Sequence, residues 1–266
     1  MSVPRCRTVL LKALSAAGAV LVRRFGKVKV SVKARANLLT EADLESQRLI
    51  LSLIRRSFPE HDVIAEEGHA SLRGSEFLWI VDPLDGTTNY AHGFPAFTVS
   101  IGLLRRGSPL LGGVFDPSSG ETFFAEAGKG AYLNGRRMRV SSVAKLSESL
   151  LITGFPYDRH RRSSYYTGFY AEFLELCHDI RRSGSAARDL AWIAAGRADG
   201  FWEFGLSPWD AAAGLLLVRE AGGQVTDFRG SAWKRYQDYG KQTLATNGRV
   251  HGRMLSVIKP MLRGGD

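Results

Sequence analysis

The sequence WIVDPLDGTTNYAHGFP, residues 79–95, carries more structural information than any other part of the chain. An apolar strand, Phe77 to Val81, runs directly into two aspartates, Asp82 and Asp85, and a Gly-Thr-Thr turn follows. Carboxylates at the end of a strand suit Mg²⁺, which prefers oxygen ligands. A turn with free backbone N–H groups can hold phosphate. One short loop therefore offers both the cation and the anion side of a phosphate-hydrolysing site.

Two better-known acidic motifs do not match this loop. A calcium-binding EF-hand loop needs acidic residues at alternating positions and a closing glutamate, whereas the order here is Asp-Pro-Leu-Asp. In aspartyl-phosphate phosphatases a single residue separates the two aspartates, whereas two residues, Pro83 and Leu84, separate Asp82 from Asp85 here. The remaining alternative is a simple Asp-Gly turn between two strands, because both residues are common turn formers.

Length and composition indicate a globular protein without disulfide bonds. The chain has 266 residues, of which 44% are hydrophobic and 23% are charged. This suits one large domain or two closely packed halves. Its two cysteines, Cys6 and Cys177, form no disulfide framework, and free thiols are typical of a reducing cytoplasm. We therefore expect a cytoplasmic location.

The N-terminal segment predicts a packed helix. Arginines precede an apolar stretch, residues 13–22, in a manner loosely like a signal peptide. However, Arg23 and Arg24 stand where a small-residue cleavage site would be expected. Four apolar residues share one helical face: Leu10, Leu14, Ala17 and Leu21. No run of 18 apolar residues occurs, so no membrane span is expected.

The net charge of +10 would attract anionic substrates and could bind nucleic acid without sequence specificity. The arginines occur as pairs spread along the chain without interleaved aromatic residues. This distribution favours a solvated basic surface.

Hydrophobic periodicity divides the chain into two halves. In residues 1–145, Thr40 caps a helix that ends at Pro59, and a short strand, Asp62 to Ala65, delivers Glu66. Apolar runs at 97–104, 110–115 and 122–125 predict an antiparallel meander. Residues 146–266 alternate strands (150–153, 179–182, 200–204, 224–228, 243–246) with helices (164–177, 186–195, 208–221, 250–261). We predict an α+β first half and an α/β second half.

Several carboxylates are expected where a strand or a helix ends. Asp43 and Asp210 each fall in the first turn of a helix, where capping alone could explain them. Asp82 is harder to explain structurally, because it follows Trp-Ile-Val and precedes Pro83, which lacks an N–H. A carboxylate there would be poorly solvated without a cation or several hydrogen bonds.

Taken together, these motifs resemble the two signatures of the inositol monophosphatase family, especially its bacterial members. The matching segments are Glu66-Glu67, Asp82-Pro83-Leu84-Asp85-Gly86-Thr87-Thr88-Asn89, and Trp209-Asp210 followed by Glu220-Ala221-Gly222-Gly223. Residues 37–43 and 182–187 match further segments, so the resemblance covers nearly the whole chain. It implies a layered αβαβα sandwich, usually a homodimer.

The resemblance also implies a site. It assigns two to three Mg²⁺ ions to Glu66, Asp82, the carbonyl of Leu84, Asp85 and Asp210. It assigns catalysis to Thr87, Asp43 and Glu66, with Thr87 held by Asp43 and orienting a metal-activated water. It assigns substrate binding to Asp85, Gly86, Thr87, Gly184, Ser185, Ala186, Glu203 and Asp210.

The implied activity is Mg²⁺-dependent hydrolysis of myo-inositol 1-phosphate or a similar polyol phosphate, with inhibition by Li⁺. Fructose 1,6-bisphosphate, histidinol phosphate and adenosine 3′,5′-bisphosphate remain alternative substrates, and a basic loop at residues 158–163 could hold a second phosphate. Some relatives associate with RNA or the transcription machinery, so a regulatory binding protein is a second hypothesis. A metal-binding protein without turnover is a third.

Overall fold

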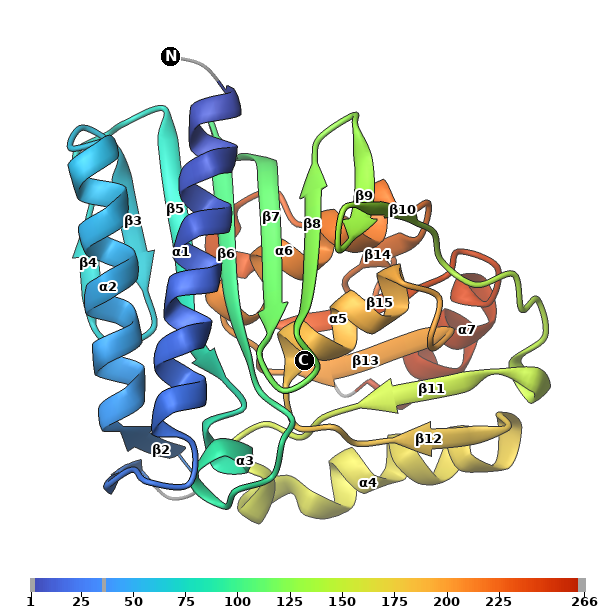
Figure 1. Ribbon diagram of the computed structural model, residues 1–266. Helices are drawn as coiled ribbons and strands as arrows, with labels where there is room; N and C mark the ends of the chain where they lie inside the picture. The colour runs from blue at the N-terminus through green and yellow to red at the C-terminus, as the bar shows by residue number, and fades with distance from the viewer. Residues whose placement is uncertain (1–2, 35–36, 263–266) are drawn as a thin grey trace.

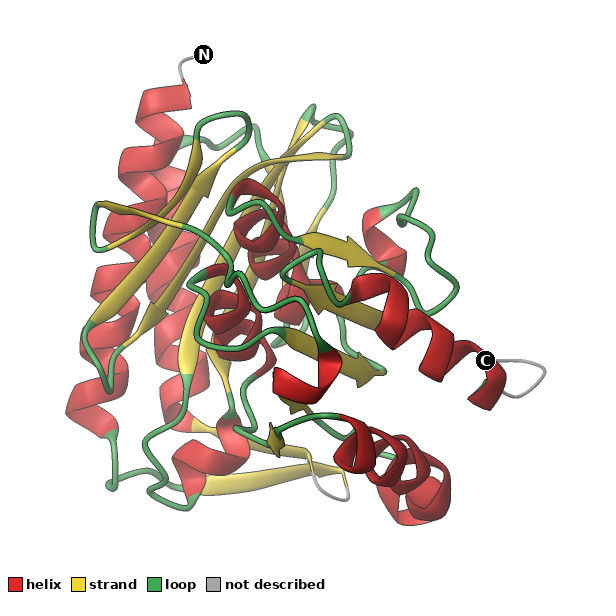
Figure 2. Ribbon diagram, turned by 90° about the vertical axis from the view of Figure 1, so that its right-hand side faces the viewer, coloured by secondary structure: helices red, strands yellow, loops and turns green. Residues whose placement is uncertain are grey.

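Helices and strands alternate in five layers (Figure 2). The computed structural model describes residues 3–34 and 37–262. α1 (Val3–Arg24) and α2 (Glu41–Ser57) cover one face of an eight-stranded sheet, as Figure 1 shows. α5 (Ala186–Ala194) and α6 (Pro208–Glu220) lie between that sheet and a five-stranded sheet. α4 (Arg159–Leu176) and α7 (His251–Met261) form the last layer. The expected αβαβα sandwich is confirmed.

The large sheet is antiparallel except where β3 pairs with β5. In sheet order its strands are β10 (Arg136–Met138), β9 (Gly130–Leu133), β8 (Glu121–Glu126), β7 (Ser108–Asp116), β6 (Thr98–Arg105), β5 (Phe77–Asp85), β3 (Asp62–Ala65) and β4 (His69–Ser71). The small sheet has the order β12 (Asp179–Arg181), β11 (Leu150–Thr153), β13 (Gly200–Phe204), β15 (Gln242–Thr246) and β14 (Gln224–Thr226).

The remaining elements are short. β1 (Val30–Ala34) and β2 (Asn37–Thr40) form an antiparallel pair, and α3 (Thr87–Ala91) follows β5. Two 3₁₀ turns occur at Leu146–Glu148 and Tyr236–Asp238.

Alternation along the strands explains the layering. In β5, Trp79 and Val81 belong to the core beneath α1 and α2, whereas Ile80 packs on the other face with α5 and α6. Successive side chains of a strand point to opposite faces, so a continuous apolar run is expected where both faces are covered. Since β5 ends between two helical layers, the aspartates that follow it lie inside the protein.

Most predicted elements are confirmed. The strands at 62–65, 150–153 and 200–204 match residue for residue, and α1 buries the expected face. The prediction missed α3, β4 and two hairpins, β1–β2 and β9–β10. Short strands carry little periodic signal, although Asn134-Gly135 between β9 and β10 is a typical hairpin turn.

One predicted loop is wrong. Residues 159–163 belong to α4 rather than to a basic loop before it. The helix has a non-helical residue at Arg162, and the carboxylate of Asp158 accepts hydrogen bonds from the hydroxyl of Tyr166 rather than capping the helix. Asp158 stands at the helix start, but its side chain does not cap the helix, so this end of α4 lacks the usual capping hydrogen bond.

The described residues contain no disulfide and no candidate membrane helix. Cys6 and Cys177 are both free thiols. Within the described part of the chain, no helix is both long and apolar enough to cross a membrane.

Close helix packing depends on glycine at position 214. A Cβ built on Gly214 of α6 would lie 2.5 Å from the Cβ of Leu190 in α5, a distance that real side chains do not tolerate. By contrast, a Cβ on Gly168 of α4 would lie 3.8 Å from its nearest neighbour, the Cε of Met261.

We predict that Gly214→Ala lowers the free energy of unfolding by about 1–3 kcal/mol, because α5 and α6 must separate. Gly168→Ala is the matched control and should gain up to about 1 kcal/mol from helix propensity. Urea unfolding followed by circular dichroism measures both. A stabilised Gly214→Ala variant would contradict this packing.

Candidate active site

A β-bulge at the end of β5 turns two aspartates to the same face. Asp82 pairs with Ser100 of β6 and Asp85 pairs with Thr98, so three residues of β5 span two residues of β6. Without this extra residue, positions three apart would point to opposite faces of the sheet. The sequence Asp-Pro-Leu-Asp therefore places both carboxylates toward the middle helical layer.

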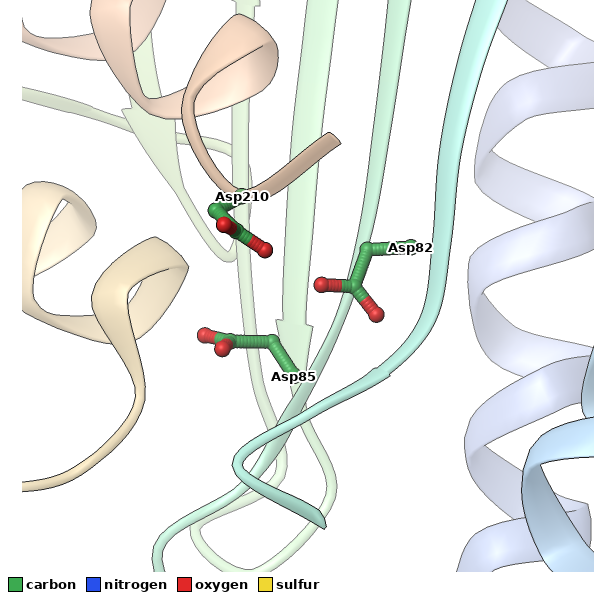
Figure 3. Close-up of side chains that lie close together, drawn as sticks. All are labelled: Asp82, Asp85 and Asp210. Atoms are coloured by element: carbon green, nitrogen blue, oxygen red, sulfur yellow. The ribbon is translucent and has the colours of Figure 1, made fainter. Parts of the chain in front are cut away.

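The third carboxylate comes from the first turn of α6. Ser207 and Asp210 form a capping box, with Pro208 at the helix start, and the backbone N–H of Ser207 donates to Asp210 Oδ2 at 2.7 Å. One carboxylate oxygen each of Asp82, Asp85 and Asp210 lies within 4.8 Å of the others. Figure 3 shows how the three side chains gather. Asp210 Oδ2 accepts the capping hydrogen bond, so the other carboxylate oxygen is available to the cluster.

The cluster is electrostatically incomplete without a cation. Burial, reinforced by the neighbouring charges of Glu66, Asp85 and Asp210, raises the pKa of Asp82 well above its usual range. Burial together with the Asp85 charge raises the pKa of Asp210 to about 7. Asp82 Oδ2 is fully buried and has no hydrogen-bond partner in the described structure. An all-oxygen donor set of this kind fits a hard divalent cation.

A second group of buried residues adjoins the cluster. Thr87 Oγ1 lies 3.2 Å from Asp43 Oδ1 and 3.0 Å from the carbonyl oxygen of Leu84, and its single proton can be donated to either acceptor. Asp43 Oδ2 caps α2 by accepting from the N–H and hydroxyl of Thr40. Burial raises the pKa of Asp43 to about 6. Asp43 is thus a helix cap that also lies within hydrogen-bond distance of Thr87, so capping does not exclude the catalytic role expected for it.

Glu66 lies in the turn after β3, next to the cluster but outside the group of three. Its backbone N–H donates to the carbonyl of Val81 at 3.1 Å, which ties the turn to β5. Its charge contributes to the raised pKa of Asp82. Glu66 can therefore influence a cation held by the three aspartates.

Asp85 joins the two sheets. Its Oδ2 accepts from the hydroxyl of Ser185 at 2.5 Å and from the N–H of Ala187 at 2.8 Å. Burial raises the pKa of Asp85, and these hydrogen bonds oppose that rise.

Gly86, which follows Asp85, has φ = 90°. A Cβ there would approach the carbonyl of Ala96 to 2.8 Å, so only glycine fits.

A polar cavity of about 130 Å³ opens beside these residues. All eight substrate residues expected from the resemblance line it: Asp85, Gly86, Thr87, Gly184, Ser185, Ala186, Glu203 and Asp210. Glu203 of β13 is buried, and burial together with the nearby Asp189 charge raises its pKa well above the usual range. Its carboxylate occupies the space where Gly154 has no side chain.

Four further polar residues line the cavity and were missed as individual contacts: Thr88, Tyr157, Arg159 and Arg182. Arg182 fell within a matched segment, and Arg159 within the basic stretch, but nothing in their spacing singled them out. Tyr157 follows Phe155-Pro156, an apolar run without a site motif. The packing of α4 on the small sheet brings Tyr157 and Arg159 to the cavity, whereas Arg182 reaches it from the end of β12.

Comparisons with known proteins agree with this geometry. The sequence model of the "Inositol monophosphatase family" matches residues 5–261. An inositol-1-monophosphatase of Synechocystis sp. is 45% identical over 256 residues, covering 94% of this chain and 87% of that protein. The Nus factor SuhB of Pseudomonas aeruginosa is 41% identical over 96% of both chains. The solved structure of the extragenic suppressor protein suhB from Bartonella henselae superimposes with a TM-score of 0.90, at 38% identity over 96% of this chain and 98% of that one.

The raised pKa values predict how stability depends on pH. Asp43 and Asp210 keep protons in the folded state up to about pH 6 and 7, whereas the unfolded chain releases them near pH 4. The cation-free protein should therefore lose stability as pH rises from about 4 to about 7, by roughly 1.4 kcal/mol per group for each unit of pKa difference.

Thermal unfolding in the presence of a chelator measures this trend. Asp210→Asn should flatten part of it, and a saturating divalent cation should oppose it, because the cation favours the ionised carboxylates. A melting temperature that rises steadily from pH 4 to 7 in the wild type, unchanged in Asp210→Asn, would contradict the proposed burial of protonated carboxyl groups.

Proposed function

The chain belongs to the inositol monophosphatase family, and we propose that it hydrolyses myo-inositol 1-phosphate or a similar polyol phosphate with the help of Mg²⁺. The phosphatase activity follows from the family. The observation that supports the cation is the buried, unpartnered Oδ2 of Asp82 within a cluster of three carboxylates. A close relative that is named an inositol-1-monophosphatase supports the polyol substrate.

We propose that Asp82, Asp85, Asp210, Glu66 and the carbonyl of Leu84 hold two to three Mg²⁺ ions. Bound Mg²⁺ supplies positive charge that makes a water more acidic and neutralises the phosphate oxygens. The aspartates fix where that charge sits, since Asp85 and Asp210 are each held through one oxygen and keep the other for the site. Their contribution is positioning and charge balance.

Thr87 and Asp43 are proposed to orient the attacking water. The hydroxyl of Thr87 donates to Asp43 Oδ1, so its lone pairs are left to accept a hydrogen bond from water. As the water attacks phosphorus, its proton can move to Thr87 while the hydroxyl proton of Thr87 moves to Asp43. A carboxyl group with a pKa of about 6 suits such a general base near neutral pH.

Glu203 and the segment at Gly184 to Ala186 are proposed to bind the leaving alcohol. They line the cavity together with Asp85 and Asp210. A polyol presents several hydroxyl donors, and the buried carboxylate of Glu203 can accept from two adjacent ones. The N–H groups of Gly86 and Thr87 are proposed to contact phosphate.

Further properties of the family are proposed for this chain on the strength of membership alone. These are inhibition by Li⁺, a homodimer and a cytoplasmic location. We also propose that the chain divides into halves at residues 1–145 and 146–266. The strands of the large sheet lie within residues 62–138 and those of the small sheet within residues 150–246, which supports this division.

The activity is tested by phosphate release with Mg²⁺ from myo-inositol 1-phosphate, fructose 1,6-bisphosphate, histidinol phosphate and adenosine 3′,5′-bisphosphate. We expect the inositol phosphate to rank first. Asp82→Asn should lower its kcat/KM by roughly 100-fold or more, because several kcal/mol of charge stabilisation are lost. Asp179→Asn, which changes an exposed, ion-paired carboxylate, should have little effect. Folded, Mg²⁺-loaded protein that releases phosphate from none of these compounds would overturn the proposal.

A second candidate function is RNA binding by a basic hairpin. Arg136, Arg137 and Arg139 are exposed around one groove beside β9 and β10, and no hydrogen bond or ion pair joins their guanidinium groups to another described residue. Unpaired cations grouped in this way can release counterions from a phosphate backbone. A relative that is named a Nus factor supports testing the idea.

If the hairpin binds RNA, changing its three arginines to glutamine should reduce the slope of log affinity against log salt by about 2 for single-stranded RNA. Filter binding across a salt series measures this slope. Asp82→Asn should bind RNA like the wild type. An unchanged slope in the triple variant would remove the hairpin from consideration.

A further inference from the structure

The segment that follows β12 and includes the first two residues of α5, residues 183–187, crosses from the small sheet to the end of β5. We refer to it as the strap. Its Gly184 has φ = 86°, and a Cβ there would come within 3.0 Å of the side-chain amide of Asn89. The strap carries Ser185 and Ala187, whose hydroxyl and N–H hold Asp85 Oδ2. Its position therefore decides which oxygen of Asp85 is left for a cation.

Two residues outside the cavity hold the strap from either side. Asn89 Nδ2 donates to the carbonyl of Ser183 at 2.8 Å and to the carbonyl of Ala96 at 2.7 Å. Asp189 Oδ1 accepts from the hydroxyl of Ser183 at 2.5 Å. The same hydroxyl oxygen accepts from the N–H of Ser185 at 3.3 Å. A short chain of hydrogen bonds thus leads from Asp189 through Ser183 and Ser185 to Asp85.

Asp189 is unusual because it is buried and takes no part in the mechanism described above. Only 1% of its surface is exposed, and no ion pair joins it to a described residue. Burying a carboxylate without a counter-charge costs free energy, so an apolar side chain at this position of α5 would favour the fold. An apolar side chain could not accept the hydrogen bond from Ser183, and this contact is what the buried carboxylate provides.

We propose that Asp189 is a positioning residue that fixes the strap through Ser183, and thereby sets the orientation of Asp85 and the Mg²⁺ affinity of the site. This inference rests on the proposed function, because it takes Asp85 as a Mg²⁺ ligand. Groups that orient the ligands of a metal commonly change its affinity by about 10–100-fold when they are removed. Asp189 reaches Asp85 only through Ser183 and Ser185, so we expect its removal to lower the Mg²⁺ affinity by about 10-fold, the lower end of that range.

The test is calorimetric titration of Mg²⁺ into substrate-free wild type, Asp189→Ala, Asp189→Asn and Ser183→Ala. We expect Asp189→Ala and Ser183→Ala to bind Mg²⁺ about 10-fold more weakly. Asp189→Asn should retain most of the wild-type affinity, because its amide oxygen still accepts from Ser183. Ser183→Ala removes the same hydrogen bond from the less buried side, so the test stands even if Asp189→Ala fails to fold.

Asp199 provides the matched control. It is also a buried aspartate of the same half, and it accepts from the hydroxyl of Ser141 and from the N–H of Leu150 at 2.7 Å. These partners lie outside the cavity. Asp199→Ala should therefore lower the melting temperature without changing the Mg²⁺ affinity, which separates positioning from a general loss of structure.

The outcomes are distinct. Wild-type affinity in Asp189→Ala or Ser183→Ala would overturn the role of Asp189, as would weak binding by Asp189→Asn equal to that of Asp189→Ala. If Asp199→Ala weakened Mg²⁺ binding equally, the weakening would be explained by lost stability, and the positioning role of Asp189 would again be overturned. Failure of the wild type to bind Mg²⁺ would instead overturn the proposed cation site on which the inference rests.

Discussion

The structure depends on the crowding of three carboxylates at one side of the polar cavity, where Asp82 is buried and Asp85 and Asp210 are half-buried. Asp82, Asp85 and Asp210 repel one another, and burial raises the pKa of each. Such an arrangement is unfavourable unless a cation or protons balance it. The bulge in β5 and the capping box of α6 force the three groups together. The packing of the surrounding sheet and helices thus offsets the repulsion between the three carboxylates and holds them where a cation could bind.

The same constraint explains why the two sheets are joined where they are. Hydrogen bonds cross between the halves only a few residues from the cluster, from Ser185 and Ala187 to Asp85 and from Asn89 to Ser183. Ser100 of β6 also donates to the carbonyl of Trp209, at the start of α6. Asp82 and Asp85 come from the first half and Asp210 from the second, so the cluster is complete only when the two halves are packed together.

The sequence predicted most strands, helices and acidic positions well, because these leave strong local patterns, whereas the layered arrangement was expected from the family resemblance. The apolar run before Asp82 indicated a strand, and the capping pattern around Asp210 indicated a helix start. The contacts made by Tyr157, Arg159 and Arg182 were not predicted, since they depend on how α4 packs against the small sheet. The role of Asp189 was also missed, because a single aspartate in a helix has no distinguishing spacing. Local chemistry is readable in a sequence, whereas positioning across the sheets requires the fold.

Binding of a cation by Asp82, Asp85 and Asp210 can be observed directly by anomalous diffraction from crystals soaked in Mn²⁺. This ion replaces Mg²⁺ at oxygen-ligand sites and can be located without ambiguity. We expect at least one strong anomalous peak bounded by these three carboxylates, with Asp82 Oδ2 among the ligands. Peaks elsewhere with none in the cluster, at a Mn²⁺ concentration that supports catalysis, would contradict this expectation.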